Sequence, residues 1–180
     1  MTIRVLVADD QAMIRGALAG LLDLESDIEV VAQASDGARA LEELARLAAA
    51  GGPARASAPV DVAIIDVEMP HMDGITATQA ICSRFPGVRV LIVSTFGRPG
   101  YLQRALDAGA TGFMVKDAPV EALAHGVRTV AAGGRAIDQS LALEALSAGS
   151  SPLTDREADD VWDEARAPLA ELIRWGFLTF

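Results

Sequence analysis

Three aspartates follow two aliphatic runs of the sequence and could share one site. The run Val60–Ile65, in "VDVAIIDVEMPHMDG", ends on Asp66, and the run Ile3–Ala8 ends on the pair Asp9-Asp10. Such a run is typical of a strand buried on both faces, where an uncompensated charge is costly. The strand could simply reach the surface at Asp66. However, three converging carboxylates repel one another, and a hard divalent cation such as Mg²⁺, which takes oxygen ligands, would offset that repulsion.

A hydroxyl group and an amine follow two later aliphatic runs. Val88–Val93 is followed by Ser94, and Gly112–Val115 is followed by Lys116. A lysine and a hydroxyl beside a carboxylate–metal cluster could neutralise a phosphoryl group from several sides. Because carboxylates form aspartyl-phosphate intermediates, Asp66 is the predicted nucleophile. Taken singly, an aspartate pair is usually a helix N-cap and a lysine is usually solvated, so the hypothesis depends on their joint placement.

The pattern of strands and helices places these side chains at one edge of a sheet. Aliphatic runs alternate with helical spacing, which predicts five strand-then-helix units. Such units form a parallel sheet with helices on both faces, and ligands bind beyond the carboxyl ends of its strands. The predicted strands are Ile3–Ala8, Ile28–Ala34, Val60–Ile65, Val88–Val93 and Gly112–Val115, and the predicted helices are Gln11–Leu24, Ala38–Leu47, Ile75–Arg84, Gly100–Ala108 and Val120–Ala132.

Composition narrows the class of protein. A chain of 180 residues suits one domain with a small appendage. It is 51% hydrophobic but only 4% aromatic, which favours an aliphatic α/β core. The formal net charge of −10 argues against a generic nucleic-acid binder. A single cysteine, Cys82, excludes an intrachain disulfide, and no leader or membrane-spanning stretch is recognised, so we expect a cytoplasmic protein with no membrane association.

Four segments of the sequence resemble the receiver domain of two-component response regulators. They are "VLVADD", "IIDVEMPHMDG", "VLIVSTF" and "GFMVKDAP", in the order found in that family. The resemblance implies a flavodoxin-like α/β fold, which is a doubly wound five-stranded parallel sheet of order 2-1-3-4-5. The predicted receiver domain covers residues 1–134. Residues Gly51–Pro59 form a longer link than is usual in the family, but such a surface connection changes the numbering more than the chemistry.

The resemblance also implies the chemistry at the strand ends. Asp66 would be the phosphoacceptor, and Lys116 would contact the phosphate. Asp10 and Asp66, with the main-chain carbonyl of Glu68, would bind Mg²⁺, and Asp9 would help through a bound water. The resemblance therefore implies a catalytic carboxylate, a lysine and a metal in one site.

A conformational switch and two kinds of partner follow from the same resemblance. A sensor histidine kinase would donate the phosphoryl group, whose charge of about −2 draws in Ser94 and Lys116. Movement of Ser94 would open space into which Phe113, the aromatic switch residue, turns inward. This would repack the face formed by 100–108, 112–115 and 120–132, through which a homodimer could form. No enzymatic activity is expected beyond self-phosphotransfer and autodephosphorylation.

The remaining residues predict a linker, 135–152, and a short helical appendage, 153–180. "SPLTDRE" resembles the start of the helix-turn-helix module of NarL/LuxR-type regulators, and Thr154 and Glu157 form a predicted capping box. This implies control of transcription. The recognition helix is expected to be missing, and residues 151–180 hold seven acidic and three basic side chains, so direct DNA binding by this chain is not expected.

Two other functions are compatible with these residues. The chain could be a stand-alone receiver that acts by protein contact or as a phosphate sink. It could also be an aspartate-nucleophile phosphohydrolase, but that class places its nucleophile after the first strand with a second aspartate two residues later, and Asp9-Asp10-Gln11 lacks this spacing. His71, in the loop after Asp66, could tune the phosphoryl lifetime, although an exposed histidine without a role is the simpler interpretation.

Overall fold

Six parallel strands form the central sheet of the part of the chain that the structure describes. The structure is a computed structural model that describes residues 2–52, 58–95 and 100–138. The strand order is β2-β1-β3-β4-β5-β6, so the predicted α/β class and the order of the first five strands are confirmed. The strands are β1 Ile3–Ala8, β2 Ile28–Ala34, β3 Val62–Asp66, β4 Arg89–Ser94, β5 Gly112–Val115 and β6 Ala136–Ile137.

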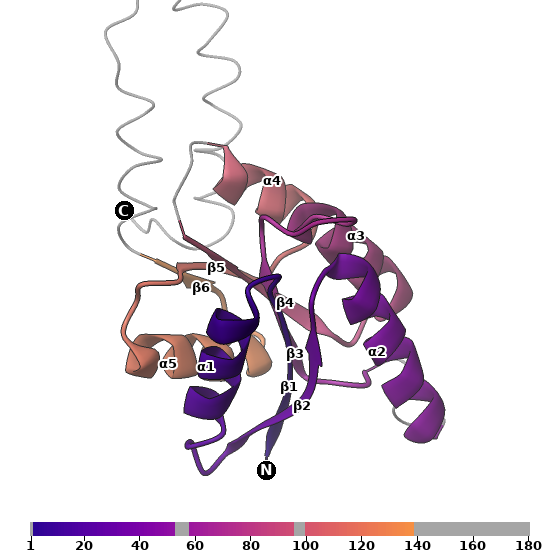
Figure 1. Cartoon of the computed structure of the whole chain (residues 1–180), viewed down its shortest axis with the longest axis horizontal. Helices are drawn as coiled ribbons and strands as arrows, with labels where there is room; N and C mark the ends of the chain where they lie inside the picture. Colours follow the sequence, from indigo (N-terminus) through magenta and orange to yellow (C-terminus); the bar gives the residue numbers. More distant parts are fainter. Residues whose placement is uncertain (1, 53–57, 96–99, 139–180) are drawn as a thin grey trace, which may run out of the picture. The chain divides into compact units, whose positions relative to one another are not determined.

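Five helices cover the two faces of this sheet. In Figure 1, α1 and α5 lie on one face, and α2, α3 and α4 lie on the other. The observed helix ends differ from the predicted ends by a few residues, because helix ends fray and local capping contacts set the terminal residue. The helices are α1 Ala12–Leu22, α2 Gly37–Ala50, α3 Gly74–Arg84, α4 Tyr101–Asp107 and α5 Val120–Ala131.

Strand β3 is buried from end to end, which explains its continuous apolar sequence. Val62 and Ile64 pack in the apolar cluster on the α1–α5 side, and Ala63 and Ile65 pack in the cluster on the α2–α3–α4 side. Successive side chains of a strand point to opposite faces, so each face of the sheet receives apolar groups. The predicted bounds need correction, because the strand begins at Val62 and includes Asp66, which pairs with Val93 of β4.

The sixth strand is the main difference from the predicted sheet. Ala136 and Ile137 pair with Gly112 and Phe113 of β5, within the range that was predicted to be a linker. The main-chain nitrogen of Asp138 also donates a hydrogen bond to the oxygen of Phe113, at 3.0 Å. Two residues are too few to give an alternating pattern, so only pairing with β5 defines this strand. The predicted helical appendage, 153–180, lies outside the described residues.

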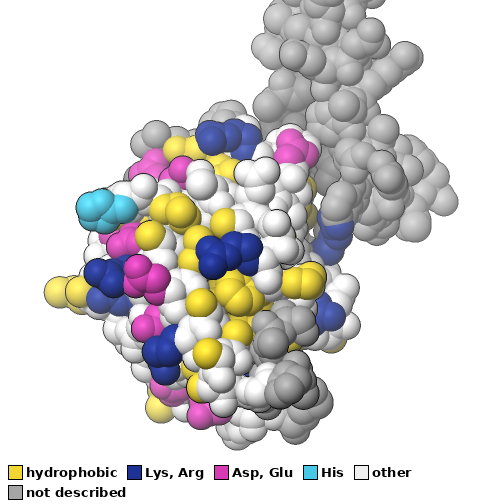
Figure 2. All heavy atoms as spheres, turned by 90° about the vertical axis from the view of Figure 1, so that its right-hand side faces the viewer, with side chains coloured by type: hydrophobic (Ala, Val, Ile, Leu, Met, Phe, Trp, Pro, Cys, Tyr) yellow, Lys and Arg dark blue, Asp and Glu magenta, His cyan; other side chains and the backbone are white. Residues whose placement is uncertain are grey.

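The surface over α2, α3 and α4 mixes both signs of charge with apolar side chains. Figure 2 faces this side of the molecule and shows basic, acidic and hydrophobic groups interspersed. On α2, Arg39 pairs with Glu42 and Arg46 pairs with Glu43, so much of the positive charge there is already matched. No helix among the described residues is long and apolar enough to cross a membrane.

Candidate functional site

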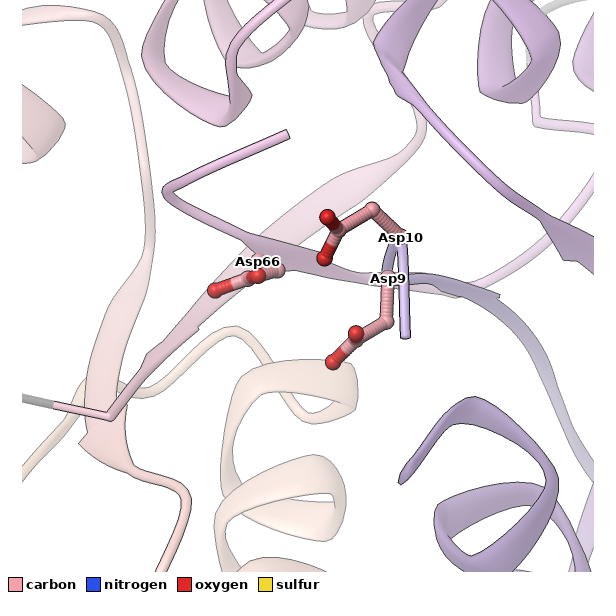
Figure 3. Close-up of side chains that lie close together, drawn as sticks. All are labelled: Asp9, Asp10 and Asp66. Atoms are coloured by element: carbon pink, nitrogen blue, oxygen red, sulfur yellow. The ribbon is translucent and has the colours of Figure 1, made fainter. Parts of the chain in front are cut away.

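The three aspartates meet where β1 and β3 end. These strands are adjacent and parallel, and Ala8 pairs with Ile65, so the residues that follow each partner lie at the same edge. Asp9, Asp10 and Asp66 each offer one carboxylate oxygen, and all three oxygens lie within 4.8 Å of one another (Figure 3). Asp9 and Asp66 are buried, whereas Asp10 is exposed. The cluster is therefore reachable from solvent on the Asp10 side.

Lys116 is the cation of this cluster. Its Nζ lies 2.7 Å from Asp9 Oδ2 and 2.9 Å from Asp66 Oδ2, and its side chain is only 6% exposed. Burial lowers the pKa of Lys116, but the contacts with Asp9 and Asp66 outweigh it, so the pKa is raised above its usual value. Burial raises the pKa of Asp66, Lys116 opposes this, and the charge of Asp9 adds to it, so this pKa is raised as well. One ammonium group among three carboxylates leaves an excess of negative charge.

Asp9 is held on several sides, partly by a residue that the sequence did not reveal. Its main-chain nitrogen donates to the oxygen of Ala34 at 3.1 Å, and its Oδ1 accepts from the nitrogen of Gln11 at 2.9 Å. Arg15 Nη1 donates to the main-chain oxygen of Asp9 at 2.6 Å. Arg15 is the one charged residue of α1, and this was the only sign in the sequence that it could have a role. The position of its guanidinium is known only from the fold. These contacts fix the turn that carries the aspartate pair.

The residues present fit Mg²⁺. Every candidate side-chain ligand is a carboxylate oxygen, the donor type that this ion prefers. Asp9 Oδ2 is buried, and its contact with Lys116 is an ion pair without the alignment of a hydrogen bond, so it retains capacity to accept from a metal-bound water. The excess negative charge of the cluster favours a divalent cation.

The loop between β3 and α3 is fixed by a cap and by a close approach of main chains. Asp73 caps α3, where its Oδ1 accepts from the nitrogens of Ile75 and Thr76, both at 2.9 Å. A Cβ on Gly74 would overlap the main-chain oxygen of Asp66, so this position requires glycine. The start of α3 thus packs directly on the main chain of the predicted phosphoacceptor.

His71, in the same loop, adopts an unusual main-chain conformation. Its φ angle is 63°, in the left-handed region that disfavours residues with a Cβ, and the residue is exposed. No contact of its side chain with the carboxylate cluster is found, so a role in phosphoryl lifetime stays a prediction.

The remaining predicted site residues lie around this edge of the sheet. Ser94 is the buried last residue of β4, and its main-chain oxygen accepts from the nitrogen of Lys116 at 2.8 Å. Phe113, in β5, is fully buried in the apolar cluster beneath α3 and α4, so an inward turn of its side chain has no exposed starting position. Glu68 is exposed, and its Oε1 accepts a hydrogen bond from the hydroxyl of Tyr101, a residue not singled out from the sequence.

Comparison with known proteins decides the family. The family model described as the response regulator receiver domain matches residues 5–128. This chain belongs to the response regulator receiver family. The resemblance inferred from the four sequence segments is therefore confirmed, and the matched residues include the whole edge that carries the three aspartates and Lys116.

Relatives of this receiver include bacterial transcriptional regulators. Over 157 residues it is 38% identical to transcriptional regulatory protein DesR of Bacillus subtilis, covering 87% of this chain and 72% of that protein. Over 156 residues it is 35% identical to transcriptional regulatory protein UhpA of Escherichia coli, covering 86% and 72%. Among solved structures, it is similar to the receiver domain of NarL from Mycobacterium tuberculosis, with a TM-score of 0.64 and 34% identity over 73% of this chain and 98% of that one.

Proposed function

We propose that this receiver accepts a phosphoryl group on Asp66 from a sensor histidine kinase and that this modification controls transcription. The observation that carries the proposal is the placement of Lys116 between two buried carboxylates, Asp9 and Asp66, beside the exposed Asp10. A buried lysine that contacts the acceptor oxygen is placed to stabilise the charge of an incoming phosphoryl group. The family match and relatives named as transcriptional regulators support the output.

The transfer follows from the chemistry of these side chains. An oxygen of Asp66 attacks the phosphorus of a phosphohistidine, so one P–O bond forms as the P–N bond breaks and the imidazole leaves with the electron pair. Lys116 neutralises part of the added charge, and the Ser94 hydroxyl contacts the transferred group. Asp10, Asp66 and the main-chain carbonyl of Glu68 would hold Mg²⁺. When bound, this ion offsets the negative charge of the carboxylates and of the phosphoryl group.

The response is proposed to pass through Ser94 and Phe113 to the face formed by α4, β5 and α5. A phosphoryl group adds a charge of about −2 beside three carboxylates that Lys116 neutralises only in part. The resulting movement would alter this face, which is also the proposed dimer contact. Control of transcription is proposed from the relatives, and the helical appendage 153–180, in which the recognition helix is expected to be missing, lies outside the described part of the chain. We further propose a cytoplasmic protein whose only reactions are self-phosphotransfer and autodephosphorylation.

Treatment with acetyl phosphate and Mg²⁺, followed by intact mass measurement, tests the acceptor. We expect the wild-type protein to gain the mass of one phosphoryl group, and Asp66→Asn to gain none, because an amide is not a nucleophile for this transfer. Asp107→Asn, an exposed substitution on α4, is the matched control and should be labelled normally. Labelling of Asp66→Asn at the wild-type level would contradict the assignment.

A further inference from the structure

A hydrogen bond joins the first residue of α4 to the loop that follows Asp66. The hydroxyl of Tyr101 donates to Glu68 Oε1 at 3.2 Å, across 33 residues of sequence. Glu68 lies two residues after Asp66, and Tyr101 begins α4. This bond, from a hydroxyl to a carboxylate, joins two segments that are far apart in the sequence. The start of α4 is therefore tied to the segment that leaves the acceptor strand.

The ring of Tyr101 also packs against the apolar interior of the protein. Tyr101 is half-buried and packs against the apolar cluster that contains Phe113 and Ala105. Phe113 is fully buried and has no hydroxyl group, so it cannot bond to the loop itself. Tyr101 therefore touches both the apolar cluster beneath α4 and the loop after Asp66.

A second residue of α4, Arg104, lies near the ring of Tyr101. The guanidinium carbon of Arg104, one turn after Tyr101, lies 5.9 Å from the centre of the tyrosine ring. Burial raises the pKa of Asp73, the cap of α3, but hydrogen bonds from Thr76 and Ile75 and the positive charge of Arg104 together lower it. Helices α3 and α4 are also in direct contact. The charge of Arg104 is thus felt at Asp73, at the far end of the loop between β3 and α3.

Gln103, between Tyr101 and Arg104 in the sequence, bonds within the helix instead. Gln103 Nε2 donates to Asp107 Oδ1 at 2.8 Å, a contact made within α4 itself. Gln103 therefore serves as a matched position on the same helix, because its side-chain hydrogen bond stays within α4.

We propose that Tyr101 is a positioning residue for the phosphoacceptor loop, and that its hydrogen bond to Glu68 transmits phosphorylation of Asp66 to α4. The inference rests on the proposed function. Phosphorylation adds a charge of about −2 two residues before the Glu68 carboxylate, and like charges repel. The carboxylate shifts relative to the hydroxyl, and the first turn of α4 follows, because Tyr101 is held by both the loop and the interior.

A double-mutant cycle tests whether the two residues act through each other. The variants are Tyr101→Phe, Glu68→Ala and both together, and the measured quantities are the rate of phosphorylation by acetyl phosphate with Mg²⁺ and the half-life of the phosphoryl group. We expect each single substitution to change one of these by about threefold, and the double variant to change it no further, as is usual for residues in direct contact. Glu68→Gln, which keeps an acceptor oxygen, should lie closer to the wild type.

The controls of this cycle exclude a general effect on the fold. Gln103→Ala should match the wild type in both measurements, since its contact lies within α4. Additive effects of Tyr101→Phe and Glu68→Ala would overturn the proposal. So would a Tyr101→Phe variant that behaves as Gln103→Ala does.

The chain contains one tyrosine, which allows a direct measurement on the protein itself. Incorporation of 3-fluorotyrosine should give one ¹⁹F resonance, assigned by its loss in Tyr101→Phe. We expect this resonance to move when Asp66 is phosphorylated, and to stay in place in Asp66→Asn treated in the same way. In Glu68→Ala it should start at a different position and move less than half as far.

This second measurement does not depend on how well any Tyr101 variant folds. A resonance that stays in place while intact mass shows full phosphorylation would overturn the role of Tyr101 and leave the proposed function standing. Absence of any mass increase would instead overturn the proposed function.

Discussion

At the scale of single residues, the site is defined by charge balance. Asp9 and Asp66 are buried carboxylates, and Lys116 is a buried cation in contact with both. A buried ion pair contributes little net stability by itself, but removal of one partner leaves the other charge buried and uncompensated. The side chains of this edge therefore depend on one another for stability as well as for chemistry.

Substitution of Lys116 by methionine should show this dependence. We expect the free energy of unfolding to fall by about 3 kcal/mol, because two carboxylates lose their cation, and phosphorylation by acetyl phosphate to be lost. Urea denaturation measures the first effect and intact mass the second. The double variant Lys116→Met, Asp66→Asn should recover part of the stability, since one buried negative charge is removed. A fully stable Lys116→Met protein would contradict the charge-balance explanation.

Arg15 makes a second residue-scale prediction. Its guanidinium holds the main-chain oxygen of Asp9, and groups that orient metal ligands typically affect affinity strongly. We expect Arg15→Ala to weaken Mg²⁺ binding about tenfold, measured by calorimetry. Arg39→Ala, an exposed change on α2, should leave the affinity unchanged. Equal affinities in Arg15→Ala and the wild type would show that the turn keeps its shape without the arginine.

At the scale of elements, an ion-pair network ties α5 to the turn between α1 and β2. Arg128 lies 2.6 Å from both Glu25 and Asp27, and its Nε donates to Asp27 Oδ2 at 2.8 Å. These partners are more than 100 residues apart in sequence. Helix α5 is therefore anchored to the turn that joins α1 to β2.

The contact between Arg128 and Asp27 should make the stability of the protein depend on pH. The hydrogen bond from Arg128 lowers the pKa of Asp27 below its usual 3.8. A carboxylate whose pKa is depressed by folding stabilises the protein above its unfolded pKa, and this contribution is lost as the pH falls through the folded pKa. The unfolded-state pKa of an aspartate lies near 3.8, so the relevant range is roughly pH 5 to pH 3. In this range the stability of the wild type should fall more steeply than the stability of Arg128→Met.

Thermal unfolding across that pH range measures the difference. Arg46→Met, which breaks an exposed pair on α2, is the control and should keep the acid dependence of the wild type. Parallel pH profiles for the wild type and Arg128→Met would mean that the network contributes nothing to folding.

Elements with a strong local pattern were the predictable part of the fold. The aliphatic runs of β1 and β3 and the helical spacing after them gave the sheet class and the edge where Asp9, Asp10 and Asp66 meet. The short strand β6 was missed, because two residues carry no periodicity. Arg15 and Tyr101 were missed for another reason: their partners are set by how segments pack, and no local spacing encodes that a helix side chain reaches a strand end or a distant loop.

At the scale of the whole molecule, negative charge dominates. The chain has 25 acidic and 15 basic residues, and the face in Figure 2 has no single-sign basic patch. Phosphate backbones attract positive surfaces, and the face in Figure 2 offers no such surface. A divalent cation, by contrast, is attracted by the carboxylates of Asp9, Asp10 and Asp66.

Mg²⁺ should therefore stabilise the fold as a whole. Binding to the folded state alone adds stability that grows with ion concentration, about 1.4 kcal/mol at ten times the dissociation constant. We expect the melting temperature to rise with Mg²⁺ for the wild type and to rise much less for Asp10→Asn. Calorimetric scans at constant ionic strength separate this effect from general screening by salt. Equal shifts for both proteins would place the ion elsewhere.

The pairing of β6 with β5 has a mechanical consequence. Ile137 is bonded alongside Phe113, and the main chain at Asp138 is fastened to the same strand. The main chain at Asp138 is therefore hydrogen-bonded directly to the main chain of Phe113. A shift of β5 would therefore carry the main chain at Asp138 with it.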